Sequence, residues 1–485
     1  MALSASVVWE VRSAQGSMSE APSVNNGGGF DSSVATPGTD YSIAAGGYGY
    51  TDLATADGDD PAVGVTSASH NFVAADEGNI IHITAGTNWT PGFYTITDTA
   101  ANAAILDRAP SSTNGALTGG TFHVGGALAA IGNIGSATAG LGAAPGNKIW
   151  VKADGAYSIG ATDTMANAGT TTLPITIEGY KTARGDGYLG RNTASDGKLI
   201  TTNFPDYVYT STFRFTLAGG SFINVRNIKF TANASIAANA LVNLSTNCLV
   251  TRCAILNPSI NSAAFGVSLS TSAQATLFDC DLFMTGASGG ATGAGIFVNG
   301  AFQRVVANRI EMTSSTSPGP AISLASTSCC VDNVIIGSAA GTFGIFTSST
   351  SSYPLIYGNT IVGFVAGIGT VDNNAGLQFI VKNLITDTAT YSVDLVDADE
   401  CAFFAYNRTR DVIATRGNTR GLSDWAVGNV ESNTGAAYSD YVDQSTGDYR
   451  LVVSSPATSA GIPAKASMGA LQRDQASSGQ KSYSC

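Results

Sequence analysis

Three aspartates in the middle of the chain have a residue type and spacing that could support acid–base chemistry. Asp279, Asp281 and Asp332 each lie directly beside one position of a short phrase that recurs between residues 223 and 407. Hydrolysis of a glycosidic bond needs two carboxyl groups roughly 5 to 10 Å apart, whereas elimination needs a metal ion and a base. We therefore take these three aspartates as the candidate catalytic residues.

A denser group of acids lies just before the last copy of the phrase. It consists of Asp394, Asp397, Asp399 and Glu400. Carboxylates at this spacing on a loop could bind Ca²⁺, and the alternative is a solvated turn without a metal. Ca²⁺ is the one cofactor that the sequence suggests. All three histidines precede the repeats, so histidine-based acid–base catalysis is not expected within them.

The recurring phrase predicts the elements that must position these acids. It reads INVRNIKF at residue 223, RVVANRIEM at 304 and PLIYGNTIV at 354, and five further copies align with these. Apolar β-branched and aromatic residues that alternate with polar ones indicate short strands rather than helices. A period of 24 to 28 residues indicates units that bury their apolar faces only by stacking on one another.

One column of the alignment is expected to form a ladder of stacked side chains inside the coils. Asn tolerates the left-handed conformation at a bend, and its amide can hydrogen-bond the Asn one coil away. Small Cys residues fill the same position in two copies. The column contains Asn227, Cys253, Cys280, Asn308, Asn333, Asn359, Asn383 and Asn407.

Strict alternation from this column predicts which side chains face the interior. The residues two positions before the column are expected to point inward, namely Val225, Phe278, Val306, Val331, Tyr357 and Val381. Asp279 and Asp332 then face outward two coils apart, at a distance on the order of 10 Å. Asp281 is expected to form a surface ion pair with Arg309 of the next coil, which contributes little to stability.

The period and the interior ladder resemble the right-handed parallel β-helix of the pectin-lyase-like superfamily. The resemblance covers roughly residues 147 to 472 and implies an all-β fold, a solenoid with a small N-terminal β subdomain. It does not extend to catalysis, because the paired-Asp strand motif and the His-bearing turn of the polygalacturonases are missing from the sequence. No acidic cluster with a nearby Arg resembles a pectate-lyase metal site. The resemblance therefore implies a fold and no substrate.

Three regions are predicted along the chain. Residues 1–146 form a first strand, which caps the open end of the coils, and an inserted β subdomain, because short strand-like runs occur there without the ladder. Residues 147–472 form the β-helix, and residues 473–485 form a flexible polar tail that ends in Cys485. Seven cysteines leave at least one unpaired, and we flag Cys485 as a candidate for an intermolecular bond.

Composition excludes several classes of partner. A net charge of −12 and a pI near 4.6 argue against nucleic-acid binding, because the chain offers no basic stripe to neutralise phosphates. No apolar run is suited to a membrane helix, and the N-terminus does not resemble a secretory signal. We expect a protein made in the host cytoplasm.

These observations favour a non-enzymatic structural protein of a bacteriophage virion: a capsid decoration, spike or fibre component. Such a protein is expected to be an oligomer, with a trimer favoured by analogy with phage tailspikes, and to bind other capsid or tail proteins or a bacterial surface glycan. One alternative is an extracellular polysaccharide lyase or glycoside hydrolase, in which Tyr353, Tyr357 and Tyr406 could stack on sugar rings. A second alternative is a bacterial surface adhesin.

Overall fold

The computed structural model of the protein contains two compact units. The first comprises Met1–Tyr157, Asp163–Gly187 and Gly219–Ile223, and the second comprises Ser158–Thr162, Tyr188–Ala218 and Asn224–Cys485. The structure describes residues 8–11, 29–30, 49–56, 63–72, 80–100, 102–111, 115–125, 131, 143, 145–153, 155–165, 167–181, 185–192, 197–210, 214–217, 220–233, 240–257, 265–269, 274–284, 294–313, 319–325, 327–338, 342–347, 353–370, 378–386, 388–395, 402–409, 413–415, 430–431, 441–443 and 448–451.

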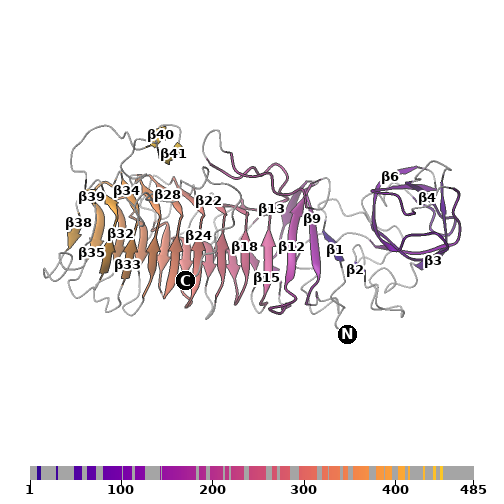
Figure 1. Ribbon diagram of the computed structural model, residues 1–485, viewed down its shortest axis with the longest axis horizontal. Helices are drawn as coiled ribbons and strands as arrows, with labels where there is room; N and C mark the ends of the chain where they lie inside the picture. Colours follow the sequence, from indigo (N-terminus) through magenta and orange to yellow (C-terminus); the bar gives the residue numbers. More distant parts are fainter. Residues whose placement is uncertain are drawn as a thin grey trace. The chain divides into compact units, whose positions relative to one another are not determined.

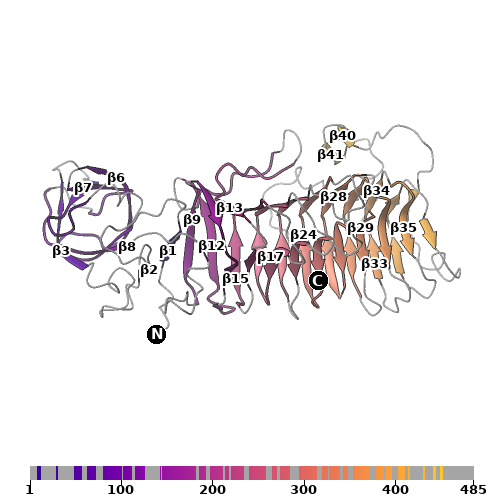
Figure 2. The ribbon, with the colours of Figure 1, turned by 180° about the vertical axis from the view of Figure 1, so that it is seen from behind.

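The second unit is a solenoid of three parallel sheets, whose strands lie side by side in both ribbon views (Figures 1 and 2). Sheet 1 contains β15 (Ile223–Arg226), β18 (Leu249–Thr251), β21 (Thr276–Phe278), β24 (Gln303–Val306), β27 (Ser328–Val331), β30 (Leu355–Tyr357), β33 (Gln378–Val381) and β36 (Ala402–Ala405). Sheet 2 contains β13 (Asp206–Tyr209), β16 (Lys229–Ala232), β19 (Ala254–Asn257), β22 (Asp281–Met284), β25 (Arg309–Met312), β28 (Val334–Gly337), β31 (Thr360–Val362), β34 (Leu384–Thr386), β37 (Arg408–Thr409) and β39 (Val430–Glu431). Sheet 3 contains β14 (Phe215–Thr216), β17 (Ala240–Leu244), β20 (Phe265–Leu269), β23 (Ala294–Val298), β26 (Ile322–Leu324), β29 (Phe343–Thr347), β32 (Ala366–Thr370), β35 (Tyr391–Leu395) and β38 (Ile413–Thr415).

The predicted parallel β-helix is confirmed by this pairing. Each coil contributes one strand to each sheet. For every pair of coils except the first, the register along sheet 1 advances by the spacing of the column residues in the sequence. In the first pair, Asn224 lies opposite Leu249, so the coil is 25 residues long and not 26. Ile228, and not Asn227, therefore occupies the position equivalent to Cys253. The prediction of Asn227 as a ladder residue was wrong by one residue, because that coil is one residue shorter than the alignment assumed.

The interior ladder runs through the five coils that carry Asn at this position. Each of the first four Asn donates its side-chain N–H to the side-chain oxygen of the next Asn, at 2.9–3.0 Å, and the same oxygen accepts the backbone N–H of the preceding Asn. The amide also reaches backbone carbonyls of the preceding coil, as Asn333 does with Val305 at 2.9 Å. All five are at most 1% exposed, so the ladder satisfies polar groups that water cannot reach.

The left-handed residue of each bend directly precedes the ladder position. Its φ lies between 53° and 67° in all eight coils, at Asn227, Arg252, Asp279, Ala307, Asp332, Gly358, Lys382 and Tyr406. The backbone N–H of this residue donates to the next coil, as from Asp279 to the Val306 carbonyl at 3.1 Å. The bend is therefore built one residue earlier than the ladder Asn to which we had assigned it.

This bend interrupts the alternation of side chains. Leu277, Val305 and Ile356 are fully buried in the interior, three residues before the ladder position. Their neighbours Phe278, Val306 and Tyr357 therefore lie on the opposite, outer face of sheet 1. The prediction that these residues point inward was wrong for every copy after the first, because it carried strict alternation through a left-handed residue.

The first unit contains a closed antiparallel barrel and the opening strands of the coil. The barrel strands are β3 (Gly49–Thr55), β4 (Gly64–Thr66), β5 (Ile80–Ala85), β6 (Gly92–Ala100), β7 (Ala103–Leu106) and β8 (Gly120–Gly125). Their core includes Leu53, Ile83 and Phe122, and the predicted N-terminal β subdomain is thereby confirmed. Separately, β1 (Val8–Val11) pairs in parallel with β9 (Lys148–Lys152), which pairs with β12 (Ile175–Tyr180), and β2 (Gly29–Phe30) pairs antiparallel with β1. The short strands β10 (Ala156–Ile159) and β11 (Asp163–Thr164) follow β9, and β40 (Tyr441–Asp443) and β41 (Asp448–Leu451) form a hairpin late in the chain.

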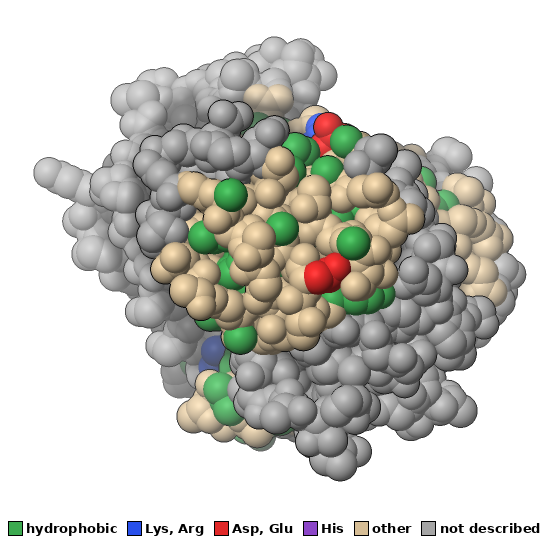
Figure 3. Space-filling model, turned by 90° about the vertical axis from the view of Figure 1, so that its right-hand side faces the viewer, with side chains coloured by type: hydrophobic (Ala, Val, Ile, Leu, Met, Phe, Trp, Pro, Cys, Tyr) green, Lys and Arg blue, Asp and Glu red, His purple; other side chains and the backbone are tan. Residues whose placement is uncertain are grey.

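One face of the molecule shows few charged side chains among its described residues (Figure 3), in keeping with 12% charged residues in the sequence. No helix occurs in the part of the chain that the structure describes, and hence none long and apolar enough to cross a membrane.

Candidate functional site

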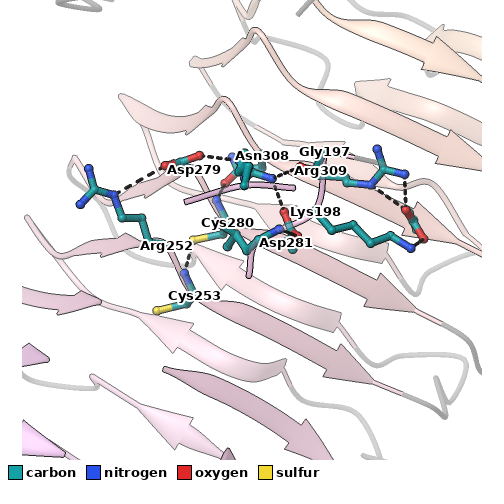
Figure 4. A network of polar contacts seen from close by, with 12 residues as sticks. Gly197, Lys198, Arg252, Cys253, Asp279, Cys280, Asp281, Asn308 and Arg309 are labelled. Atoms are coloured by element: carbon teal, nitrogen blue, oxygen red, sulfur yellow. Dashed lines mark hydrogen bonds and ion pairs between the residues drawn. The ribbon is translucent and has the colours of Figure 1, made fainter. Parts of the chain in front are cut away.

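Two of the three candidate aspartates are held by one guanidinium group. Asp279 and Asp281 flank the ladder residue Cys280 (Figure 4). Both carboxylates bind Arg191, which lies 88 and 90 residues earlier in the sequence. Arg191 Nε donates to Asp279 Oδ1 at 2.9 Å, and Arg191 Nη1 donates to Asp281 Oδ1 at 2.7 Å. The structure therefore brings Asp279 together with Asp281 through a shared cation.

Arg191 belongs to a short segment laid over the outside of sheet 2, which we call the arm (residues 188–192 and 197–200). The Asn192 N–H donates to the Lys198 carbonyl at 2.7 Å, and Arg191 and Leu199 form an antiparallel bridge. Gly197 has a φ of 68°, which suits glycine at a tight turn, and its carbonyl accepts a second bond from Arg191 Nη1 at 2.8 Å. The turn of the arm therefore accepts a hydrogen bond from Arg191, the same residue that attaches the arm to the coils.

Backbone contacts complete the anchor. The Leu199 N–H donates to Asp281 Oδ2 at 2.6 Å, so both oxygens of this carboxylate are engaged by the arm. The Asp281 side chain is 1% exposed, Asp279 is 13% exposed and Arg191 is 21% exposed. The arm therefore excludes water from Asp281 almost completely.

Further cations and acids surround this centre. Arg252 approaches Asp279 Oδ2 at 3.7 Å, and its guanidinium lies 4.1 Å from the centre of the Tyr188 ring in the arm. On the other side, Lys198 Nζ lies 3.4 Å from Glu311 Oε2. These contacts attach both ends of the arm to the coils.

The predicted surface ion pair between Asp281 and Arg309 is not the contact that the structure makes. The two residues are opposite each other in β22 and β25, as the repeat predicted. Arg309 Nε instead donates to Glu311 Oε1 at 2.6 Å, while Asp281 binds Arg191. The prediction was wrong because it considered only neighbouring coils, and no periodic pattern in the sequence indicates that a distant segment covers Asp281.

The electrostatics of the centre follow from burial and from the shared charges. Burial raises the pKa of Asp281, and the opposing effects of Arg191 and the Leu199 N–H do not cancel that rise. Burial alone would lower the pKa of Arg191, but Asp281 and Asp279 together raise it above its ordinary value. Arg191 therefore stays charged and remains a fixed counter-ion to the two carboxylates.

This arrangement is suited to anchoring a segment and poorly suited to hydrolysis. A hydrolytic pair needs one carboxyl that reaches the substrate as an acid and another with room for a water or a sugar carbon. Here the oxygens of Asp281 are occupied and buried under the arm. Its partner Asp279 shares the same cation.

Asp332 lies apart from this centre. It is the left-handed residue two coils beyond Asp279, as the register through Val306 and Val331 shows, and is partly exposed. One coil further on, a Cβ on Gly358 would come within 2.3 Å of Asp332 Oδ1. Gly358 therefore meets two needs, a φ of 67° and space for this carboxylate.

The predicted metal site is described only in part. Asp394 lies within β35 and is 4% exposed, so it is part of a strand and does not lie on a solvated loop. Asp397, Asp399 and Glu400 lie outside the described residues. Among the residues that are described, no group of three or more His, Cys, Asp or Glu side chains is placed to hold a metal ion.

The aromatic candidates fall on the outer face and the bend of sheet 1. Tyr353 is 54% exposed and precedes β30, whereas Tyr357 packs on the outer face with Lys382 Nζ 5.3 Å from its ring centre. Tyr406 is the left-handed residue of its bend. Cys485, flagged for an intermolecular bond, lies outside the described residues.

Comparison with known proteins finds no family, and its matches to solved structures are too distant to carry an argument about function. No protein-family model matches the chain, and no curated protein matches it either. Among solved structures, pectate lyase Pel9A is similar with a TM-score of 0.44 and 14% identity, covering 67% of this chain and 88% of that one. An alginate lyase from Paenibacillus has a TM-score of 0.24 and 11% identity, covering 60% of this chain and 92% of that one.

A phage protein is among the similar structures as well. Tailspike protein 3 of bacteriophage CBA120 has a TM-score of 0.23 and 11% identity, covering 60% of this chain and 57% of that one. The chain is a parallel β-helix. This fold agrees with the resemblance to the pectin-lyase-like superfamily, and its function has to be argued from its own residues.

Proposed function

We propose that this chain is a non-enzymatic structural component of a bacteriophage virion, a decoration, spike or fibre element built on a rigid β-helix. The observation that carries the non-enzymatic part is the engagement of Asp279 and Asp281 by Arg191 under the arm. The carboxylates closest to a hydrolytic arrangement act as anchors for a backbone segment. Their geometry contributes to stability.

The pairing of the coils supports a role that demands persistence. Among the described strands of the three sheets, all but those at the ends pair with strands of the coils before and after them, and the ladder satisfies polar groups inside. A body built this way exposes few strand edges to proteases or to other chains. That property suits a protein that must survive outside a cell, attached to other capsid or tail proteins as a homo-oligomer, with a trimer as our proposal.

The first test separates binding from cleavage. Purified protein is incubated with a panel of bacterial polysaccharides, and the products are assayed for new reducing ends and for the ultraviolet absorbance of unsaturated uronates. We expect no cleavage, and a discrete oligomer by native mass spectrometry. Cleavage of a polysaccharide that Asp332→Asn abolishes would contradict this proposal and identify the protein as a depolymerase.

A polysaccharide lyase or hydrolase is the second candidate, favoured by exposed aromatic side chains. Tyr353 is 54% exposed and Phe379 is 37% exposed, and the Phe379 N–H donates to the carbonyl of Pro354, the residue after Tyr353. Aromatic rings in such positions can stack on sugars. Glycan binding that Tyr353→Ala and Phe379→Ala weaken, without any cleavage, would assign these residues to attachment, in agreement with the virion proposal.

A further inference from the structure

Exposed aromatic side chains gather along one edge of the solenoid. Among the described residues, the well-exposed large hydrophobic side chains include three aromatic ones, Phe302 at 62%, Tyr353 at 54% and Phe379 at 37%. All three lie within strands of sheet 1 or at most two residues before them, in four successive coils. Single exposed apolar side chains are common on protein surfaces, whereas a group of them in one place marks an interaction surface.

Phe302 and Tyr353 occupy the same position of the bend that leads into sheet 1, two coils apart. The Phe302 N–H donates to the Thr327 carbonyl at 2.6 Å, and the Tyr353 N–H donates to Thr327 Oγ1 at 3.4 Å. The strand register of these coils agrees with this placement. Coils lie about 4.8 Å apart, so the two aromatic residues are about 10 Å apart along the edge, with a threonine between them.

The backbone at Phe302 has a conformation that disfavours an aromatic residue. Its φ is 60°, in the left-handed region where bulky side chains are uncommon. The same position carries Asn247 and Gln274 in the two preceding coils, also with left-handed φ. Phenylalanine combines this unfavourable backbone with a ring exposed to water, and neither property benefits folding. Strain that is kept at an exposed aromatic residue points to contact with a ligand.

An arginine lies beside the rings. Arg304 comes two residues after the exposed phenylalanine in β24, and it points outward because its neighbours Gln303 and Val305 are fully buried in the interior. Its Nε is buried without a hydrogen-bond partner among the described residues. The acids of the neighbouring coils, Asp279 and Asp332, lie in the bend at the far end of sheet 1. That bend is about 10 Å away along the strand, about the distance over which salt screens a charge.

These residues form a narrow line that offers too little apolar area for a protein partner. We call Phe302, Arg304, Thr327, Tyr353 and Phe379 the strip. Its three rings expose roughly 300 Å² in total at about 200 Å² for each whole side chain. A stable protein interface buries about 800 Å² on each partner. A linear chain of rings, about as wide as one side chain, fits such a line along the coils.

We propose that the strip binds a linear polysaccharide that carries carboxylate groups, with sugar rings stacked on Phe302 and Tyr353 and a carboxylate on Arg304. An aromatic ring can cover the apolar face of a sugar, and a planar guanidinium takes a carboxylate through two parallel hydrogen bonds. Two coils span about 10 Å, close to the length of a disaccharide, so both rings contact one chain. This inference rests on the proposed function, because it names the class of surface polymer that the virion component holds.

Binding is tested with the full-length protein and three uronate polymers: hyaluronan, polygalacturonate and alginate. Each is compared with its carboxyl-reduced form by biolayer interferometry. We expect binding to at least one of the uronate polymers, about tenfold tighter than binding to its reduced form, because the charged hydrogen bonds to Arg304 are lost on reduction. Absence of binding to all three polymers overturns the proposal, and so does equal binding to a polymer and to its reduced form.

Arg304→Gln isolates the role of the charge. It should lower the affinity for the uronate polymer about tenfold and leave the affinity for the reduced form unchanged, a difference that a general loss of folding does not produce. Tyr353→Ala should weaken binding of both forms alike. Leu189→Ala, which removes a 49% exposed side chain of the arm, is the control and should change neither affinity. Equal losses for both forms in Arg304→Gln overturn the contact between Arg304 and the carboxylate.

Phe302→Asn separates binding from folding. Asparagine already occupies this position at Asn247 and tolerates the left-handed backbone, so the variant should unfold at the same temperature as wild type or higher. Its affinity for the uronate polymer should fall about tenfold, as expected when a stacking ring is lost. Reduced stability with unchanged affinity would show that the ring serves the fold, which overturns the proposal. A changed oligomeric mass without polymer binding would show that the strip joins copies of the chain, which overturns it equally.

The inference and the proposed function fail separately. New reducing ends released from a bound polymer contradict the non-enzymatic function and leave the strip as the binding site. Neither binding nor cleavage removes the strip as a binding site and leaves the structural role in place.

Discussion

The ladder has two parts that differ in chemistry, and the arm lies over one of them. From Asn308 to Asn407 the interior position carries an amide in every coil, with hydrogen bonds of 2.8–3.2 Å. At Cys253 and Cys280 the same position carries a thiol, and its contacts are 3.4–3.9 Å long. A thiol is a weak donor and acceptor, so these coils gain less from the interior.

The outer surface compensates at the same coil. Cys280 is flanked by Asp279 and Asp281, the two carboxylates that Arg191 binds. Where the interior ladder changes from amide to thiol, a charged anchor on the outside joins the coil to the arm. The comparison shows that coils of the same repeat can be stabilised by hydrogen bonds of the interior ladder or by an ion pair on the outer surface. Substitutions can remove each kind of interaction separately.

The largest expected effect comes from removing the charged anchor. Arg191→Met leaves the carboxylates of Asp279 and Asp281 without their cation in a largely dry site, and we expect a loss of about 3–5 kcal/mol in the free energy of unfolding. Urea unfolding followed by circular dichroism measures it. Lys229→Met, which breaks the more exposed pair with Asp206, is the matched control and should cost at most about 1 kcal/mol.

A combined variant identifies the origin of the loss. If the uncompensated carboxylates cause it, Asp279→Asn and Asp281→Asn added to Arg191→Met should restore part of the stability. Equal destabilisation by Arg191→Met and Lys229→Met would contradict the view that the arm is anchored by a buried charge.

The next effect contrasts the two parts of the ladder directly. Asn333→Ala removes the acceptor of the Asn308 N–H and the donor to the Val305 carbonyl, both buried. We expect a loss of about 2–3 kcal/mol, because each buried group left without a partner costs about 1–3 kcal/mol. Cys253→Ala, at the thiol end, should cost about 1 kcal/mol. Similar losses for the two variants, measured by the same unfolding experiment, would remove the distinction between the two parts.

A conversion of one part into the other should have a smaller effect. In Cys280→Asn the new amide can accept the Cys253 N–H, which the thiol now meets at 3.4 Å, and can donate to the Asn308 oxygen. We expect a gain of up to about 1 kcal/mol, observed as a higher midpoint of thermal unfolding. Cys280→Ala is the control, and a Cys280→Asn protein less stable than Cys280→Ala would mean that this coil does not accommodate the amide.

The period of the repeat predicted the fold because stacking imposes a coil length, and the column residues marked it in the sequence. The same column predicted the wrong inward residues, since Phe278 and Val306 lie beyond a left-handed residue that resets the alternation. Left-handed φ is adopted here by Arg, Asp, Ala and Lys as well as Gly and Asn, so residue type did not reveal it. Once the strand register of sheet 1 is known, the left-handed residue of each bend can be located directly before the ladder position.

The sequence allowed the acidic residues of the anchor to be predicted, but not the arginine. Asp279 and Asp281 were recognisable from their place beside the ladder, whereas Arg191 is part of a segment without the repeat. A long-range ion pair leaves no periodic signal in one sequence. The only feature of the sequence that pointed to the anchor was the composition of the arm region, which contains glycines and both positive and negative residues. Such a segment can supply the cation that a buried pair of carboxylates needs.

The smallest effect concerns pH and compares Asp281 with Asp52 of the barrel. Burial raises the pKa of Asp281 above about 3.9, the value in an unfolded chain. Between these two pKa values the folded protein holds a proton that the unfolded chain releases. The contribution of Asp281 to stability is therefore fully present below the unfolded value and is lost as the pH rises through the folded value. Relative to Asp281→Asn, wild type should gain stability as the pH falls into this window, by no more than about 1.4 kcal/mol per pH unit.

Asp52 should show the opposite sign. Burial acts to raise its pKa, but hydrogen bonds from Ser67 and Ser69 outweigh that effect and hold the pKa below its ordinary value. Its contribution is present above about 3.9 and is lost as the pH falls through the folded pKa. Unfolding of wild type, Asp281→Asn and Asp52→Asn in urea at a series of acidic pH values compares the two. Slopes of the same sign would show that the carboxylate under the arm is governed by hydrogen bonding and charge, as Asp52 is, and not by its burial.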